Sequence, residues 1–491
     1  MSKAPGMPSS SSSSPLTSQP PLSTASPPAM PLPLRTIPGS YGWPLLGPIF
    51  DRLDYFWFRG PANFFKKRME KHKSTVFRTN LPPTWPLFLG INPNVIAVLD
   101  CKSFLHLFDM EIVDKKNVLA GDYMPSVKFT GNLRTCIYLD TSEPQHAKIK
   151  NFVIDILKRS STVWLTELKA NLDILFDTIE TSISAKGSAR LSFPLQKCLF
   201  NFLTTAIVGA DPTTDPTIAD SGYAMLDRWL ALQILPTIKI GILQPFEEIF
   251  LHSFAYPFAL VRGDYSKLYN FVEKHGNEVV QRGVNEFGLT KEEAIHNLLF
   301  TLGFNAFGGF SAFLPTLIGT ITSDKTGIQE KLRKEVKEKI GSSSLNFESV
   351  KDLELVQSFV HETLRLNPPV PLQYGRARKD FQLSSHDSVY DIKKGELLCG
   401  YQPQVMKDSK VFEDPESFKA ERFMGEKGRE LLNYLYWSNG PQTGSTTESN
   451  KQCPGKDIVP LTSFLFVAYI FQRYESISGS SSSITAVEKA K

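Results

Sequence analysis

Residues 437–457, WSNGPQTGSTTESNKQCPGKD, form the segment that decides which fold this chain is expected to adopt. Cys453 follows Gly440 by thirteen positions, and most of the residues between them are small or polar. The segment then narrows to Lys-Gln-Cys-Pro-Gly at 451–455. We therefore ask why a long polar loop should end on a single cysteine.

The composition of the whole chain limits the class of protein. Its 491 residues suggest about three domains by length alone, but no second linker, repeat or interior low-complexity run divides them. Hydrophobic residues make up 41%, enough for one large core. The net charge of +4 is small and its basic residues do not cluster, so no nucleic-acid partner is expected. Five scattered cysteines indicate a reducing compartment without a disulfide framework.

The first 35 residues differ from the rest, because they are rich in Ser and Pro and contain no acidic side chain. Such a segment buries too little apolar surface to order itself, so we expect a disordered tail over 1–35. It fits a plastid transit peptide or a plain tail. We find no apolar stretch long enough to span a bilayer and expect no transmembrane segment. Peripheral association with a membrane through surface apolar residues stays open.

Beyond the tail, the pattern predicts a mainly α fold with small β-sheets. Short β-like runs occur at 75–78 and 86–89, whereas helical spacing of apolar residues dominates from Ser142 onward. Ser142 or Thr141 is the predicted N-cap of the first long helix. His146 and Lys150 are four residues apart and should share one face of it.

The segment that begins at Thr290 is predicted to be a buried central helix, since Thr290 and Glu293 have capping-box spacing and the following residues are apolar nearly all round. Its interior glycines, at 303 and 308–309, each cost about 0.5–1 kcal/mol relative to alanine. They indicate either close helix packing or a groove where a flat ligand lies against the backbone. In the second case Asn305 is the polar group of an apolar pocket.

Three features of the C-terminal half occur in a recognisable order. HETLRLNPPVP contains Glu362 and Arg365, DPESFKAERF contains Arg422, and the Cys453 segment follows. A Glu-x-x-Arg pair alone is a common surface ion pair, but this order resembles the cytochromes P-450, the haem-thiolate superfamily, from about residue 37 to the C-terminus. The resemblance implies a cytochrome P-450 fold, with 36–491 as a single haem-thiolate catalytic domain.

The resemblance also implies a cofactor and its ligand. Haem b (iron protoporphyrin IX) is expected between the central helix and the cysteine loop, with the Cys453 thiolate on the iron. Glu362, Arg365 and Arg422 are expected to form a buried structural network behind the haem. Backbone amides and positive charge favour a thiolate, which suits a cysteine between Lys451 and a glycine.

The chain departs from the usual superfamily pattern at four points. Lys451 replaces the usual arginine, and a polar insertion of about nine residues separates Gly440 from Cys453. The usual acid and threonine after the glycine pair are missing, because 308–312 reads Gly-Gly-Phe-Ser-Ala. A membrane anchor is also missing. Together they indicate an enzyme that needs no reductase and whose substrate already contains an O–O bond.

Four segments are similar to the plant fatty-acid hydroperoxide branch, which comprises allene oxide synthases, divinyl ether synthases and hydroperoxide lyases: PLRTIPGSYGWPLLGPI, YLDTSEPQH, GFNAFGGFS and NKQCPGKD. The resemblance implies that Asn305 is catalytic and hydrogen-bonds the hydroperoxide. Ser311 stands where allene oxide synthases commonly have lysine, at a substrate contact. The positions implied to contact the haem, with cations against its two propionates, are Lys115, His146, Lys150 and Lys451.

Within this branch the resemblance implies homolysis of the O–O bond at ferric haem, and the pocket decides the fate of the resulting carbon radical. Leu119 stands where allene oxide synthases have phenylalanine, whose ring could favour a cation by roughly 0.5–2 kcal/mol. We therefore expect a hydroperoxide lyase of the chloroplast that converts linolenic and linoleic 13-hydroperoxides into a six-carbon aldehyde and a twelve-carbon oxo-acid. The alternatives are an allene oxide or divinyl ether synthase, a reductase-dependent monooxygenase and a non-catalytic haem carrier.

Overall fold

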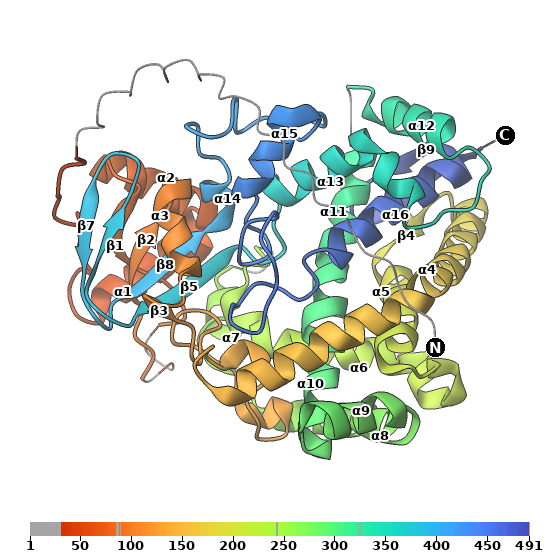
Figure 1. The fold of residues 1–491 in the computed structure, drawn as a ribbon, viewed down its shortest axis with the longest axis horizontal. Coiled ribbons are helices and arrows are strands. Elements are labelled where there is room, and N and C mark those ends of the chain that lie inside the picture. Colours follow the sequence, from red (N-terminus) through yellow and green to blue (C-terminus); the bar gives the residue numbers. More distant parts are fainter. Residues whose placement is uncertain (1–30, 85–87, 89, 242–243, 324–325, 491) are drawn as a thin grey trace, which may run out of the picture.

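The computed structural model describes residues 31–84, 88, 90–241, 244–323 and 326–490, and the prediction of a mainly α fold with small sheets is confirmed. The five-stranded and two-stranded sheets lie on one side of the molecule, and most of the helices lie on the other together with the three-stranded sheet (Figure 1). Most of the predicted tail, residues 1–30, lies outside the described residues. Its last part does pair with the domain, because Leu34 forms a parallel bridge with Val389.

The helices follow the chain from the sheet side to the helical side and back. Their bounds are α1 Leu46–Leu53, α2 Pro61–His72, α3 Cys101–Phe104, α4 Pro144–Lys186, α5 Ser192–Leu203, α6 Pro216–Ile234, α7 Phe246–Phe250, α8 Arg262–His275, α9 Asn277–Phe287, α10 Lys291–Phe300, α11 Gly308–Thr322, α12 Ile328–Lys339, α13 Glu354–Leu366, α14 Gln402–Val405, α15 Gly425–Leu431 and α16 Ile458–Arg473.

Three sheets accompany these helices. The main sheet has the order β1-β2-β8-β5-β3, a three-stranded sheet has the order β4-β10-β9, and β6 pairs with β7. The predicted run at 75–78 corresponds to β1, whereas the run at 86–89 falls mostly on residues outside the described part of the chain. The strand bounds are β1 Val76–Asn80, β2 Asn94–Val98, β3 Val113–Asp114, β4 Ala189–Arg190, β5 Leu372–Ala377, β6 Phe381–Ser384, β7 Val389–Ile392, β8 Leu397–Tyr401, β9 Tyr474–Gly479 and β10 Ser483–Lys489.

The central helix runs through the helical side as α10, a π-helical segment over Thr301–Phe307, and α11 (Figure 1). The predicted capping box is present, because Thr290 and Glu293 cap each other reciprocally. Two of its glycines are explained by helix packing: a Cβ at Gly303 would lie 2.6 Å from the Leu226 side chain, and one at Gly308 would lie 2.8 Å from Leu230, both on α6.

Lys291–Thr322 is also the one stretch of the described chain that is long and apolar enough to cross a membrane by length and composition. The expectation that no stretch of that length exists was therefore wrong. In this structure 56% of its most apolar window is buried inside the protein, as in the core helix of a globular domain.

The predicted N-cap of α4 was also wrong. The helix begins at Pro144 after Glu143, which makes no side-chain cap. Ser142 is engaged elsewhere, since its hydroxyl donates to the Asp140 carboxylate at 2.6 Å. A nearby acid thus competes with the helix end for the serine.

Candidate functional site

The cysteine loop is a compact hydrogen-bonded turn rather than an open excursion. The Cys453 amide donates to the Ser438 backbone oxygen at 2.9 Å, so the two ends of the insertion lie side by side. The Gln452 side chain closes it by donating to the Pro441 oxygen at 2.7 Å. A Cβ at Gly440 would lie 2.8 Å from the Gln452 side chain, so this close approach requires the glycine.

No contact within the described chain requires a glycine at position 455. A Cβ there would lie 3.7 Å from the Cys453 Sγ, an ordinary contact, so the chain itself does not demand glycine. Burial raises the pKa of the Cys453 thiol, while the Gly455 amide and the nearby charge of Lys150 act in the opposite direction. These two influences favour the thiolate that a metal ligand requires.

The first turns of α4 are tied to the inserted loop. His146 and Lys150 share a face and are both buried. The His146 Nδ1 lies 3.0 Å from the Glu448 oxygen, and Lys150 Nζ donates to the backbone oxygens of Asn450, at 3.2 Å, and Gln452. Figure 1 shows the loop between α15 and α16 in the middle of the molecule, beside the sheet and near α4. The insertion therefore supplies acceptors that position His146 and Lys150 on α4.

Lys451 and Lys115 lie on the other side of this loop. Lys451 Nζ donates to three backbone oxygens, those of residues 136, 137 and 139, at 2.8–3.2 Å, so all its protons are engaged. Among the described residues, Lys115 Nζ donates only to the Asn439 Oδ1, at 2.5 Å, and has two further protons without an acceptor. Asn439 was not predicted from the sequence as a site residue, and it also donates to the Lys451 backbone oxygen at 2.8 Å. Its Asn-Gly dipeptide and positive φ of 60° were the available signal.

The electrostatics of this cluster point to an anionic partner. Burial, together with repulsion from Lys451, lowers the pKa of Lys115 to about 7, and burial lowers the pKa of Lys451 to about 8. Burial and the neighbouring lysines lower the pKa of His146 to about 4. None of the three ammonium groups, on residues 115, 150 and 451, forms an ion pair with a described carboxylate. Cations held this way would be stabilised by an added anion.

The residues present fit the two carboxylates of a haem. The buried His146 Nε2 has no hydrogen-bond partner, and Lys115 has donors to spare. Buried polar atoms are nearly always satisfied. A bound anion would favour the protonated imidazole, whose Nε2–H can donate to a carboxylate. Lys150 has one free donor, whereas Lys451 has none and would contribute its charge alone.

One face of the central helix is left uncovered by other side chains. Asn305 and Ala312 are exposed although they lie in the middle of this helix, and a Cβ at Gly309 would meet no atom within 4 Å. Asn305 belongs to the π-helical segment, a feature that is frequent at functional sites. Its amide makes no hydrogen bond within the described chain. Ser311 lies nearby on the helix with its hydroxyl buried and unsatisfied.

Leu119 lies in a tight turn rather than on a helix with Lys115. Its amide and that of Ala120 both donate to the Tyr123 oxygen, at 3.1 and 3.2 Å. The side chain is half-buried and packs against both hydrophobic clusters of the protein. Leu119 and Lys115 lie on no common helix, so their spacing of four residues does not place them on one face.

Glu362, Arg365 and Arg422 are brought together in one network, in which the Glu362 and Arg365 side chains are fully buried and that of Arg422 is 4% exposed. Arg365 binds the Glu362 carboxylate through two hydrogen bonds of 2.7 and 2.8 Å, and Arg422 Nε lies 3.0 Å from both carboxylate oxygens. Arg365 also donates to the oxygens of Met406 and Pro415. The network thus joins α13 to the segment that precedes the cysteine loop.

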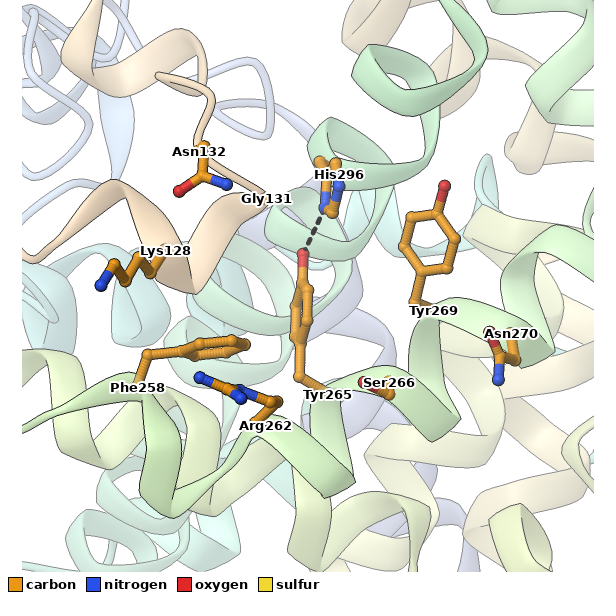
Figure 2. Close-up of a pocket in the computed structure, with 10 residues that line it drawn as sticks. All are labelled: Lys128, Gly131, Asn132, Phe258, Arg262, Tyr265, Ser266, Tyr269, Asn270 and His296. Atoms are coloured by element: carbon orange, nitrogen blue, oxygen red, sulfur yellow. Dashed lines mark hydrogen bonds between the residues drawn. The ribbon is translucent and has the colours of Figure 1, made fainter.

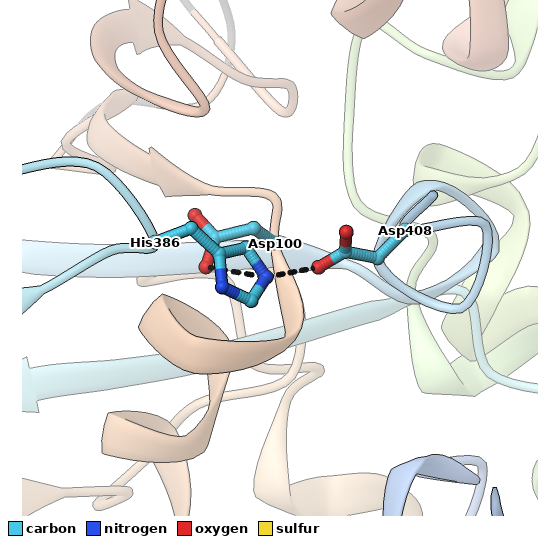
Figure 3. A group of neighbouring side chains, drawn as sticks. All are labelled: Asp100, His386 and Asp408. Carbon is cyan, nitrogen blue, oxygen red and sulfur yellow. Dashed lines mark hydrogen bonds and ion pairs between the residues drawn. The ribbon is translucent and has the colours of Figure 1, made fainter. Parts of the chain in front are cut away.

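Two other features lie apart from the cysteine loop. A pocket of about 480 Å³ lies between the chain at 128–132, α8 and α10 (Figure 2). Asp100, His386 and Asp408 form a cluster, with His386 Nε2 2.6 Å from Asp408 (Figure 3). Each carboxylate oxygen of the cluster already accepts at least one hydrogen bond. The cluster therefore has a structural role, because it links the β6–β7 connection to α3. The donors, besides His386, are Thr75, Cys101, Lys102, Ser103 and Lys410.

Comparisons with known proteins agree with this geometry. The profile of the family "Cytochrome P450" matches residues 322–486. The fatty acid hydroperoxide lyase of Solanum lycopersicum is 66% identical over 96% of this chain and 99% of its own length. The linolenate hydroperoxide lyase of Arabidopsis thaliana is 60% identical over 97% and 96%. An allene oxide synthase of Arabidopsis thaliana is 41% identical over 94% and 90%.

The chain therefore belongs to the cytochrome P450 family, whose members are haem-thiolate proteins. Within it, the chain lies in the plant branch of fatty acid hydroperoxide lyases and allene oxide synthases.

Proposed function

We propose that the protein is a fatty-acid hydroperoxide lyase of oxylipin biosynthesis, which cleaves the 13-hydroperoxides of linolenic and linoleic acid into hexenal or hexanal and a twelve-carbon oxo-acid. The observation that carries the proposal is the uncovered face of the central helix, where the amide of Asn305 is the polar group beside Gly309 and Ala312. The two hydroperoxide lyase relatives, at 66% and 60% identity, stand nearer than the allene oxide synthase at 41%.

We infer that the cofactor is haem b, held by Cys453 on the iron and by Lys115, His146 and Lys150 on its carboxylates. When bound, the haem supplies the one-electron chemistry that splits an O–O bond. The Asn305 amide orients the hydroperoxide by donating to one of its oxygens. The surrounding apolar side chains exclude water, so that the carbon radical can recapture the oxygen that was split from the hydroperoxide.

The proposed reaction needs neither molecular oxygen nor a reductase. The aldehyde and the oxo-acid together contain all the atoms of the hydroperoxide, so no electrons enter or leave overall. Position 311 is serine and position 312 alanine, in place of an acid and a threonine that would deliver protons to oxygen. The compact insertion also occupies the surface of the cysteine loop where an electron donor would dock.

The decisive experiment is incubation of the purified protein with linolenic acid 13-hydroperoxide under nitrogen and without NADPH. We expect complete consumption, with hexenal and the oxo-acid as products. Cys453→Ser should lose both turnover and the thiolate-type spectrum of the ferrous carbon monoxide complex, and Asn305→Ala should lose turnover while it retains haem. Ketol products without aldehyde would instead identify an allene oxide synthase, and dependence on NADPH would identify a monooxygenase.

We also propose a plastid location, in line with relatives that are described as chloroplastic, and peripheral attachment to the envelope. Two neighbouring segments expose large apolar side chains, and Arg52 joins them through a 3.1 Å ion pair with Glu248. His252 stacks on Phe56 at 3.6 Å between them. Such a contiguous apolar surface suits a lipid bilayer. Its members are Trp43, Leu45, Leu46, Phe50, Trp57 and Phe58, at 40–78% exposure, and Ile238, Ile240, Phe246, Ile249 and Phe250, at 37–60%.

Flotation with vesicles of phosphatidylglycerol and phosphatidylcholine tests the attachment. The double variant Phe50→Ser and Phe246→Ser should lose vesicle binding. Phe193→Ser on α5, where the side chain is 60% exposed, is the matched control and should bind as the unmodified protein does. Equal binding by all three proteins would contradict attachment through this surface.

A further inference from the structure

The pocket at the outer end of the central helix has the lining of an anion site. Its volume is about 480 Å³, and the chain at 128–132, the segment 258–270 and His296 on α10 enclose it (Figure 2). None of the ten residues that line it is acidic. It shares no residue with the cysteine loop or with the uncovered face of Asn305.

Two cations at its rim have no partner. Within the described residues, neither the Lys128 ammonium nor the Arg262 guanidinium makes a hydrogen bond or an ion pair. They come from segments far apart in the chain, and Figure 2 shows them on opposite walls. The rings of Phe258 and Tyr265, 5.8 Å apart and edge to face, form an apolar wall beside Arg262. The pocket therefore combines positive charge with aromatic surface.

A third donor lies at the back of the pocket. His296 is only 8% exposed, and its Nδ1 lies 2.7 Å from the hydroxyl of Tyr265. Burial raises the pKa of Tyr265 and lowers that of His296, so the hydroxyl keeps its proton and the imidazole is neutral. The Tyr265 hydroxyl has no other acceptor among the described residues, so we assign it as the donor to Nδ1, which leaves the ring proton on Nε2. No described residue accepts from this Nε2.

Gly131 leaves room for the His296 ring. Its φ is +66°, and a Cβ at this position would lie 2.0 Å from the His296 Nε2. Any side chain here would both strain the backbone and displace the imidazole. The backbone at Gly131 therefore packs directly against the edge of the His296 ring that carries Nε2.

We propose that this pocket binds an amphiphilic anion, a carboxylate with an apolar chain, whose head group contacts Arg262, Lys128 and the His296 Nε2 while its chain lies against Phe258 and Tyr265. The guanidinium and imidazole donors suit a carboxylate, and the aromatic wall distinguishes an amphiphile from a free inorganic anion. If the proposed lyase function holds, its twelve-carbon oxo-acid product belongs to this class. His296 and Asn305 lie on one continuous helix, nine residues apart, so occupancy of the pocket can influence the catalytic segment.

Hydrogen–deuterium exchange of the haem-loaded protein tests the site, with dodecanoate as the probe below its micellar concentration. We expect slower exchange in segments 127–133 and 258–270. In the double variant Lys128→Gln and Arg262→Gln, the dodecanoate concentration needed for half-maximal protection should rise at least tenfold. Lys267→Gln, an exposed charge on the same helix outside the pocket, is the matched control and should match the unmodified protein.

Several results would overturn the proposal. The first is that dodecanoate does not slow exchange in these two segments. The second is that it slows exchange equally in the double variant and in the unmodified protein. Equal protection by dodecanol would show that charge is not recognised, and equal protection by inorganic phosphate would show that the apolar chain is not. Dodecanoate carries no hydroperoxide and the readout is local, so failure here leaves the lyase function intact, and loss of lyase activity leaves this result unchanged.

Discussion

The His146 Nδ1 lies 3.0 Å from the backbone oxygen of Glu448, so the inserted loop and the first turn of α4 hold each other in place. A carbonyl only accepts, so Nδ1 carries the proton and Nε2 faces the interior without a partner. The long polar loop before Cys453 thereby orients a histidine and a lysine toward one buried space. This is a structural reason for the insertion in addition to any effect on docking partners.

The first prediction follows from the pKa of His146, which burial and the nearby lysines lower to about 4 in the haem-free protein. The unfolded chain titrates near 6.5 and so binds more protons than the folded one between these values. We therefore expect the haem-free protein to lose stability as pH falls from about 6.5 to about 4, by at most about 1.4 kcal/mol per pH unit from this group.

Urea unfolding of the haem-free protein between pH 4.5 and 7 measures this effect. His146→Gln should show a shallower pH dependence than the unmodified protein, because the remaining buried histidines are common to both. It should also bind haem more weakly. Parallel pH profiles for the two proteins would mean that His146 titrates normally.

The second prediction is that the buried ammonium of Lys115 lowers the stability of the haem-free protein but strengthens haem binding. Burial and Lys451 lower its pKa to about 7, below its unfolded value, so the folded haem-free protein becomes less stable as pH falls from about 10 toward 7. Lys115→Met should therefore stabilise the haem-free protein at pH 7 by about 1–3 kcal/mol and weaken haem binding.

The control for this prediction is Lys116→Met, which removes the same charge from an exposed neighbour. It should leave both the thermal midpoint of the haem-free protein and the haem affinity nearly unchanged. Destabilisation by Lys115→Met would show that the ammonium is already balanced within the protein.

The third prediction concerns Glu362, whose carboxylate holds two arginines with no exposure to solvent. Glu362→Gln leaves two buried guanidinium groups with a neutral partner, so unfolding should become easier by about 3–5 kcal/mol. Asp380→Asn removes the same charge from the exposed pair with Lys393 and should change the denaturation midpoint little. Similar denaturation midpoints for the two variants would show that the network contributes little to the free energy of unfolding.

These cases show where sequence reasoning succeeded and where it stopped. The capping box at Thr290 and the shared face of His146 and Lys150 depend on local spacing alone, which a helix fixes. Asn439 was missed because its role depends on Lys115, 324 residues away. The π-helical segment around Asn305 was also missed, because a single wider turn changes the spacing of apolar residues too little to be recognised in the sequence. Packing of Gly303 against Leu226 likewise requires tertiary contacts.

The last prediction concerns Leu119 and the product of the reaction. Leu119 is half-buried in the turn closed by Tyr123 and packs against both hydrophobic clusters. Under the proposed function, a leucine that faces the substrate offers no aromatic surface, so it would not help the carbon radical toward a cation and would leave it free to recapture oxygen. Leu119→Phe should shift products from aldehyde toward the ketols formed from allene oxide, because a ring favours a developing cation by roughly 0.5–2 kcal/mol.

Leu119→Met is the control, since it keeps an apolar side chain of similar volume without a ring and should retain the aldehyde fraction. Overpacking by phenylalanine is expected to cost about 1–3 kcal/mol if the turn cannot adjust, which a lower melting temperature would reveal. Product ratio and melting temperature together therefore separate two roles for the residue. A lower melting temperature with an unchanged aldehyde fraction would identify Leu119 as a packing residue, because strain in the turn would then act on stability without reaching the radical.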